Sequence, residues 1–252
     1  MQEINFFFCV FFPLDLEINS FIFASGQNVQ LRIKMKYAFI FDMDGVIVDS
    51  NPTHKIALQQ FCKEHGYQLS EDDLRKKIYG RTNRDWLLNL FGELDEATIE
   101  RYAYQKEALF RSLYTGIKPL NGLVAFMDQL DQLKISRAIA TSAPRANVDF
   151  TLDKTDLRKY FNTILDDSFV TEGKPNPQIY LKSAQSLGFD PTYCIVLEDS
   201  LSGVTAGKRA GCKVIGLTTT HSPEELAESD MVINDFEGIS PQSLISQLYE
   251  PI

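Results

Sequence analysis

Residues 37–50 read Tyr-Ala-Phe-Ile-Phe-Asp-Met-Asp-Gly-Val-Ile-Val-Asp-Ser. An apolar run this short, closed by an aspartate and soon followed by a glycine, is typical of a strand buried on both faces at the centre of a parallel sheet. Open parallel sheets bind ligands beyond the carboxyl ends of their strands. Asp42 and Asp44 are therefore predicted to lie where chemistry takes place, although a polar loop that only ends the strand is the simpler alternative. Two carboxylates this close repel each other unless a cation joins them, which indicates metal-assisted acid–base chemistry or a nucleophile beside an acid.

The composition excludes several classes of function. The chain has 252 residues, enough for one large domain or for a core with a smaller partner domain. Its net charge of −9 disfavours binding to nucleic acid or to a membrane surface, and an anionic substrate would need a local device such as a metal ion or a lysine. The four cysteines are scattered without a C-x-x-C pair, so we expect buried thiols in a reducing compartment, the cytoplasm. We expect a monomer or a weak homo-oligomer.

Residues 1–34 do not share the regular pattern of the remaining chain. Their dense apolar run, residues 6–12, lacks a basic region before it, is too short to span a bilayer and is followed by Pro13 and Asp15. We therefore expect neither a secretory signal nor a membrane span in this N-terminal extension. The pattern becomes regular at Met35, and we predict that a chain beginning there folds and acts normally.

Residues 51–118 are predicted to contain helices only. Pro52 suits a first helical position, Ser70 begins a capping box, and Gly92 suits a helix end. A long helix with an apolar stripe is predicted from about residue 95 to residue 114. Four helices without an intervening strand indicate an all-α module inserted into another fold.

After Gly122 the pattern changes to alternating helices and strands, which predicts an α/β fold with a doubly wound parallel sheet. The predicted strands span residues 135–140, 162–165, 193–197, 213–217 and 231–233, and the predicted helices span residues 124–133, 148–157, 177–187 and 201–210. Together with the first strand, they predict a catalytic core made of residues 35–50 and 119–252, with residues 51–118 as a helical cap.

Three more polar groups follow predicted strands or precede a predicted helix, and these are Thr141-Ser142, Lys174 and Glu198-Asp199-Ser200. Each alone has an ordinary interpretation, because Thr-Ser and acidic pairs often cap helices and a lysine beside prolines is usually solvated. Together they place hydroxyl donors, a cation and a second carboxylate pair at one edge of the sheet. Phosphoryl transfer needs this set: a nucleophile, a metal held by carboxylates, and donors for the phosphoryl oxygens.

In this order and spacing the motifs resemble the haloacid dehalogenase-like superfamily, in the branch of phosphatases and phosphomutases that carries a helical cap. The motifs are Asp42-Met-Asp44-Gly45-Val, Thr141-Ser142, Lys174-Pro-x-Pro177 and Glu198-Asp199-Ser-x-x-Gly203-x-x-Ala206. The resemblance covers residues 36 to 235. It implies a Mg²⁺-dependent enzyme that acts on a small phosphorylated metabolite.

The resemblance also implies roles for the acidic residues. Asp42 would be the nucleophile that forms an aspartyl-phosphate, and Asp44 would be the general acid and base. Mg²⁺ would be held by Asp42, by the backbone carbonyl of Asp44 and by Asp199, with Glu198 close by.

The other core motifs would bind the transferring group, according to the same resemblance. Thr141 would donate to a phosphoryl oxygen, and Lys174 would offset the negative charge that gathers around the phosphoryl group. Ser142, next to Thr141, is a candidate for substrate binding.

In this family the cap closes over the core and determines which substrate fits, so its polar residues are further candidates for substrate binding. His54 lies where β-phosphoglucomutase-like members carry a histidine, although a helix histidine can simply pack. Arg81 and Arg84 lie in a turn that resembles the family's cap loop and would bind a distal anionic group, unless they are solvated. Lys106 lies on the apolar stripe of the long helix, where lysines more often extend along the edge to solvent.

Other classes of protein fit the sequence less well. Residues 203–209 resemble a P-loop, but the spacing is one residue short and no Ser or Thr follows Lys208. The glycine motif of dinucleotide-binding domains is absent after the first strand. A phospho-accepting signalling receiver or a non-catalytic binding module remains a less favoured alternative, because the helical insertion and the Asp42-x-Asp44 spacing argue against a receiver.

Hydrolysis and mutase chemistry would begin with the same aspartyl-phosphate and differ in the acceptor. His54 favours a β-phosphoglucomutase-type mutase, which is the main alternative. Pro144 and Asn83 favour hydrolysis, because they stand where the similar mutases carry a lysine and an arginine. We therefore predict a Mg²⁺-dependent phosphatase that acts on a small phosphate monoester such as a phosphosugar.

Overall fold

The computed structural model describes residues 37–249. Its centre is a sheet of six parallel strands in the order β3-β2-β1-β4-β5-β6, which confirms the predicted doubly wound sheet. The strands are β1 (Ala38–Phe41), β2 (Ser136–Ala140), β3 (Thr163–Leu165), β4 (Cys194–Glu198), β5 (Lys213–Leu217) and β6 (Met231–Ile233). The predictions for residues 1–34, including the start at Met35, lie outside the described residues.

Strand β1 is the central strand, as the buried apolar run predicts. It pairs in parallel with β2 on one side and with β4 on the other, so that Phe41 is level with Ile139 and Leu197. The residues that follow these three positions therefore meet at one edge of the sheet. This register brings Asp42 beside Glu198 and close to the end of β2.

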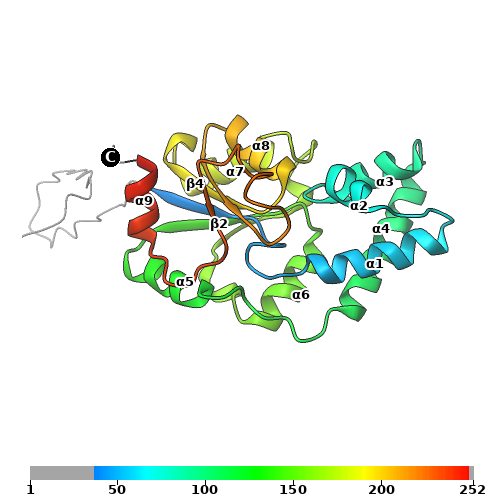
Figure 1. The fold of residues 1–252 in the computed structure, drawn as a ribbon, viewed down its shortest axis with the longest axis horizontal. Helices are drawn as coiled ribbons and strands as arrows, with labels where there is room; N and C mark the ends of the chain where they lie inside the picture. The colour runs from blue at the N-terminus through cyan, green and yellow to red at the C-terminus, as the bar shows by residue number, and fades with distance from the viewer. Residues whose placement is uncertain (1–36, 250–252) are drawn as a thin grey trace, which may run out of the picture.

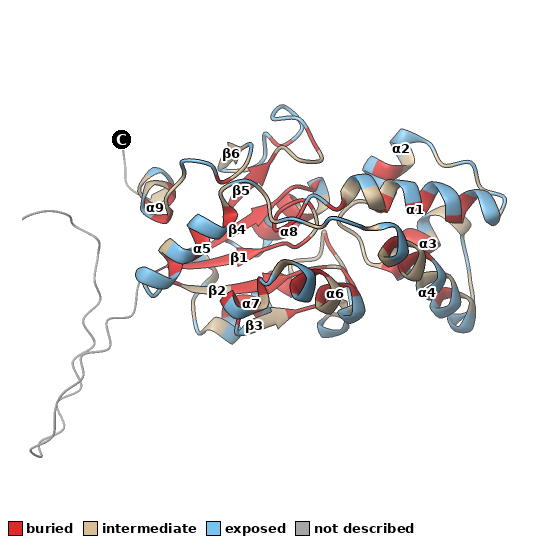
Figure 2. Cartoon of the chain, turned by 90° about the horizontal axis from the view of Figure 1, so that it is seen from below, coloured by how far each residue is buried: buried red, intermediate tan, exposed pale blue. Residues whose placement is uncertain are grey.

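Helices cover both faces of the sheet (Figure 1). Along β1 the side chains alternate between the faces, with Phe39 and Phe41 in one apolar cluster and Ala38 and Ile40 in the other. The first cluster packs against α5 (Leu123–Gln132), α6 (Arg145–Thr155) and α9 (Pro241–Tyr249), and the second packs against α7 (Gln178–Leu187) and α8 (Leu201–Arg209). Helix α9 is an addition to the elements predicted from the sequence. Figure 2 shows the resulting pattern, in which buried positions lie between the layers and exposed positions lie on the outer faces of the helices.

The inserted segment is helical, as predicted, and lies at the carboxyl edge of the sheet (Figure 1). It contains α1 (Asn51–Glu64), α2 (Glu71–Asp73), α3 (Asn83–Phe91) and α4 (Glu96–Leu113). Helices α1, α3 and α4 share an apolar cluster that includes Phe61 and Trp86. Ser70 forms the predicted capping box with Asp73. The boundaries of core and cap at residues 50 and 118 stay a prediction.

The second cap helix, which begins after the capping box of Ser70, is not α-helical throughout. It consists of α2 and a π-helical turn, η1 (Leu74–Ile78), closed by a bond from the Tyr79 amide to the Leu74 carbonyl at 2.9 Å. Leu74 and Ile78 both insert into the apolar cluster of the cap, so packing accompanies the widened turn. No helix in the described range 37–249 is both long and apolar enough to cross a membrane.

Candidate active site

The carboxyl edge of the sheet holds a buried lysine between two carboxylates. Lys174 Nζ lies 2.7 Å from Asp42 Oδ1 and 2.5 Å from Glu198 Oε1. Asp42 follows β1 and Glu198 ends β4, whereas Lys174 comes from the segment before α7. All three side chains are almost completely buried. Burial alone would lower the pKa of Lys174, but the two carboxylates outweigh it and raise that pKa, so the lysine is a cation.

Glu198 is held by the start of helix α8. Its Oε2 accepts hydrogen bonds from the backbone amides of Asp199 (3.0 Å) and Ser200 (2.9 Å), and from the Ser200 hydroxyl. Ser200 is also the N-cap of α8, because its hydroxyl accepts from the Gly203 amide. Only glycine fits at position 203, since a Cβ there would lie 1.8 Å from Glu198 Oε1. Burial would raise the pKa of Glu198, but Lys174 and these donors lower it overall.

Asp199 completes a cluster of three carboxylates. Asp42, Glu198 and Asp199 each offer an oxygen within 4.8 Å of the others. Burial raises the pKa of Asp42 to about 7; Lys174 opposes this rise and Glu198 adds to it. Burial and the charges of Glu198 and Asp42 likewise raise the pKa of Asp199 well above its ordinary value. Three buried carboxylates beside one lysine leave excess negative charge, and a hard divalent cation with oxygen ligands fits this cluster.

Asp44 is separate from this cluster and belongs to a chain of contacts with the cap. Its Oδ1 accepts a hydrogen bond from the Ser50 hydroxyl at 2.5 Å and lies 3.4 Å from His54 Nε2. His54 Nδ1 is 2.9 Å from Lys106 Nζ, and the His54 ring stacks on Phe110. Burial would raise the pKa of Asp44, but His54, the Ser50 hydroxyl and Lys106 together outweigh it, so the pKa is lowered. A lysine ammonium can only donate, so Nδ1 of His54 accepts and Nε2 carries the proton that faces Asp44.

The series of contacts that begins at Asp44 continues from Lys106 into the core. Lys106 Nζ donates to Glu107 Oε1 at 2.9 Å, and Glu107 Oε2 accepts from Asn147 Nδ2 at 2.6 Å. Asn147 Oδ1 in turn accepts from Arg111 Nη1 at 2.6 Å. Glu107 and Asn147 were not predicted as site residues. Their sequence signal is weak, because an acid beside a lysine on a helix normally faces solvent.

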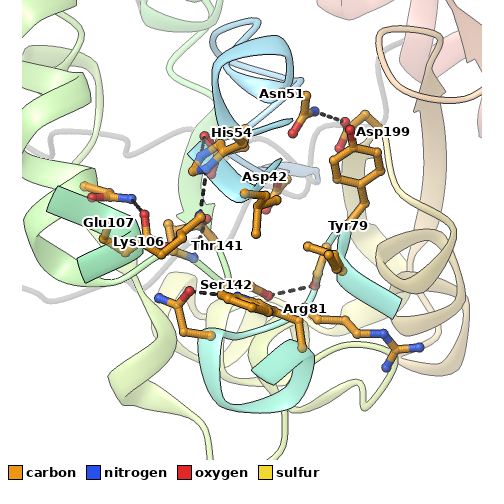
Figure 3. Close-up of a pocket in the computed structure, with 18 residues that line it drawn as sticks. Asp42, Asn51, His54, Tyr79, Arg81, Lys106, Glu107, Thr141, Ser142 and Asp199 are labelled. Atoms are coloured by element: carbon orange, nitrogen blue, oxygen red, sulfur yellow. Dashed lines mark hydrogen bonds and ion pairs between the residues drawn. The ribbon is translucent and has the colours of Figure 1, made fainter. Parts of the chain in front are cut away.

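One pocket collects most of the predicted site residues (Figure 3). The predicted residues that line it are Asp42, Asp44, His54, Arg81, Lys106, Thr141, Ser142 and Asp199. Lys174 and Glu198 are buried and contact Asp42, which itself lines the pocket. The lining also contains Asn83, which stands where the similar mutases carry an arginine, and Asn51, Trp86, Glu107 and Asn147, which the sequence did not indicate as site residues.

The two cap arginines differ in their positions. Arg81 lies at the pocket edge, where Figure 3 shows its guanidinium directed away from Asp42, and it reaches the Lys76 carbonyl at 3.4 Å. Arg84 is not among the lining residues and forms two hydrogen bonds with the exposed Glu96, at 2.5 and 2.8 Å. The structure therefore places Arg84 outside the pocket lining, and its role in substrate binding stays a prediction. The reason is local: Thr82 is the N-cap of α3, so Arg81 precedes the helix whereas Arg84 lies on its solvent face.

Ser142 contacts the cap in this structure. Its hydroxyl donates to the Gly80 carbonyl at 2.9 Å, and the hydroxyl of Ser202, on α8, donates to the neighbouring Tyr79 carbonyl at 3.2 Å. Thr141 is fully buried and its hydroxyl accepts from the Ala143 amide at 3.1 Å. The hydroxyl proton of Thr141 remains available to an oxygen in the pocket, since one acceptor bond does not use it.

Comparisons with known proteins identify the family of this chain. Hexitol phosphatase A of Escherichia coli (strain K12) is 32% identical over 204 residues, which cover 80% of this chain and 92% of that protein. Phosphorylated carbohydrates phosphatase of Thermotoga maritima is 34% identical over 183 residues, which cover 71% of this chain and 83% of that protein. The crystal structure of a HAD hydrolase, family IA, variant 3, from Entamoeba histolytica superposes with a TM-score of 0.76 at 30% identity, covering 84% of this chain and 99% of that one. The family model of the haloacid dehalogenase-like hydrolases matches residues 39–217, and the chain belongs to this family.

Proposed function

We propose that the protein is a Mg²⁺-dependent phosphatase that hydrolyses a small phosphate monoester, such as a sugar or polyol phosphate, through an aspartyl-phosphate on Asp42. One observation carries the proposal: Asp42 lines a pocket between the cap helices and the sheet edge, within a buried cluster of three carboxylates and one lysine. The names of the hexitol and carbohydrate phosphatase relatives support the substrate class.

In this proposal each polar group near Asp42 has a defined task. Asp42, Asp199 and the backbone carbonyl of Asp44 would hold Mg²⁺, with Glu198 beside them. Bound Mg²⁺ supplies positive charge that orients the phosphoryl group and stabilises its negative charge. Lys174 opposes the rise in the pKa of Asp42 and would hold its Oδ1 in place beside the phosphoryl group, and the Thr141 hydroxyl would donate to a phosphoryl oxygen.

Asp44 transfers the proton in both halves of the reaction. A bound dianionic phosphate raises the proton affinity of Asp44, which allows the acid to protonate the leaving oxygen. The resulting carboxylate then activates water for attack on the aspartyl-phosphate. The N–H of His54 and the Ser50 hydroxyl hold the carboxylate in place, and Lys106 fixes the tautomer of His54 that makes this contact possible.

The charges in the pocket favour hydrolysis over mutase chemistry. A mutase must hold a bisphosphate in two orientations, which requires cations for a second phosphate. Lys106 is already paired with Glu107, and Asn83 is neutral and accepts a hydrogen bond from Trp86 Nε1 at 2.8 Å. Among the described residues of the pocket lining, this leaves Arg81 alone to bind a second phosphate. A second dianion would also lie near Glu107, and we infer that it binds poorly.

A phosphate-release screen tests the proposal directly. The substrates are sugar and polyol monophosphates, sugar bisphosphates, nucleotides and pyrophosphate, and a parallel assay follows conversion of β-glucose 1-phosphate to glucose 6-phosphate. We expect Mg²⁺-dependent release from monophosphates, no isomerisation, and no release by Asp42→Asn. Rapid isomerisation with little phosphate released would show that the protein is a mutase. Full activity in chelator would disprove the proposed Mg²⁺ site.

A further inference from the structure

The carboxylate of Asp199 is held by two side chains from other parts of the chain. Asn51 Nδ2 donates to Asp199 Oδ2 at 2.8 Å and to Thr220 Oγ1 at 2.6 Å. The hydroxyl of Thr220 donates to the same Asp199 Oδ2. Asn51 is the first residue of α1 in the cap, and Thr220 lies in the loop after β5 (Figure 3 shows the bond from Asn51). Each proton of the Asn51 amide and the single proton of the Thr220 hydroxyl therefore has its own acceptor.

The surroundings leave this carboxylate little room to turn. Gly45 has a φ of +75°, and a Cβ at this position would lie 2.0 Å from Asp199 Oδ2 and 2.7 Å from Asn51 Nδ2. The hydroxyl of Thr219 donates to the Gly45 carbonyl at 2.6 Å. The loop after β5 thus contacts the loops that follow β1 and β4. Thr219 contacts the first at Gly45, and Thr220 contacts the second at Asp199. The donors described here share one oxygen of Asp199, which leaves its second oxygen for a cation.

We propose that Asn51 and Thr220 are positioning residues of the Mg²⁺ site and that Asn51 makes its metal affinity depend on the position of the cap. This inference rests on the proposed Mg²⁺-dependent function. With the cap closed, Asp199 is fixed by both donors; when α1 moves away, the amide of Asn51 leaves with it and only Thr220 remains. Residues that orient a metal ligand typically change metal affinity by about 10–100-fold when they are removed. Coupling is reciprocal, so bound Mg²⁺ also favours the closed cap.

The test is the dissociation constant of Mg²⁺, measured by calorimetry on the full chain without substrate. Asn51→Ala and Thr220→Val are expected to weaken binding by about 10–100-fold. Thr220→Ser keeps the hydroxyl and is expected to bind Mg²⁺ like the wild type. Thr218→Val is the matched control, because the hydroxyl of Thr218 lies in the same loop but donates to Asn234 Oδ1 at 2.8 Å, away from Asp199.

Kinetics separate positioning from direct catalysis. In both weakened variants the Mg²⁺ concentration for half-maximal activity should rise in proportion to the dissociation constant, while kcat at saturating Mg²⁺ stays within about threefold of the wild type. Thermal melts in chelator verify the fold of each variant, and Thr220→Val tests the idea even if Asn51→Ala fails to fold. If folded Asn51→Ala and Thr220→Val bind Mg²⁺ with wild-type affinity, the inference is wrong, but the proposed phosphatase function is unaffected. Failure of the wild type itself to bind Mg²⁺ would overturn both.

Discussion

Replacing Asp42 by asparagine should abolish turnover and stabilise the metal-free protein. Asp42 shares a buried space with two other carboxylates and with Lys174, and burial raises its pKa to about 7 from the ordinary 3.8. At 1.36 kcal/mol per pKa unit, this difference means that ionised Asp42 costs about 4 kcal/mol at pH 8 without metal. Asparagine has the shape of the neutral acid, and its carbonyl can still accept from Lys174. We therefore expect Asp42→Asn to gain about 2–4 kcal/mol in chelator at pH 8, a rise in Tm of roughly 5–15 °C.

The difference in unfolding free energy between Asp42→Asn and the wild type depends on pH, and the sign of the pKa shift of Asp42 gives the direction. A carboxyl whose folded pKa is raised contributes stability below its unfolded pKa, and this contribution is lost as the pH rises through about 7. The advantage of Asp42→Asn should therefore shrink as the pH falls from 8 to 5. Melting curves in chelator at both pH values measure it, and phosphate release should fall by at least about a thousandfold. If Asp42→Asn melts below the wild type at pH 8, the ion pair of Asp42 with Lys174 stabilises the fold more than burial and repulsion from the other carboxylates destabilise it. Native-like turnover in this variant would disprove the assignment of Asp42 as the nucleophile.

Three further results are expected. Because protonated Asp42 and Asp199 bind a cation poorly, the apparent affinity for Mg²⁺ should tighten at least about tenfold between pH 6 and pH 8, and a flat calorimetric profile would contradict this. Lys106→Met leaves the buried carboxylate of Glu107 without its cation and should cost about 3–5 kcal/mol of unfolding free energy in urea; a smaller loss than 1 kcal/mol would mean that Glu107 becomes neutral or reaches solvent. Arg84→Ala breaks only an exposed pair with Glu96, so kcat/KM and the midpoint of urea unfolding should both stay at the wild-type values, whereas a large rise in KM would return Arg84 to the substrate site.

The core could be predicted closely because its elements carry local signals. Buried parallel strands have short apolar runs, and each run was followed by polar residues that the parallel register brings to one edge of the sheet. Asp42, Thr141 and Glu198 are therefore placed by their own strands, whatever the surrounding loops do. Helix α9 had an ordinary signal in Leu244, Ile245 and Leu248, at helical spacing after Pro241, and was missed although the signal was present. The location in the cytoplasm and the oligomeric state stay predictions.

Cap residues were harder to place, because periodicity shows which side of a helix is apolar but not which polar residue faces another domain. Arg81 and Arg84 are three residues apart, yet one lies at the pocket edge and the other in solvent. Contacts such as Asn51–Asp199 and Glu107–Asn147 join residues 148 and 40 positions apart. Both depend on how α1 and α4 lie against the core, which a single sequence does not specify.

The first turn of α1 connects these observations. Ser50, Asn51 and His54 occupy positions i, i+1 and i+4, which share one side of a helix, and this side faces the acidic edge of the sheet. Ser50 and His54 contact Asp44, and Asn51 contacts Asp199, so one helical turn orients both the proposed acid–base and a proposed metal ligand. A rotation of the cap at its junction with β1 would therefore displace all three contacts together. In the proposed mechanism, closure of the cap would therefore do more than exclude water, because it would complete the geometry of Asp44 and Asp199.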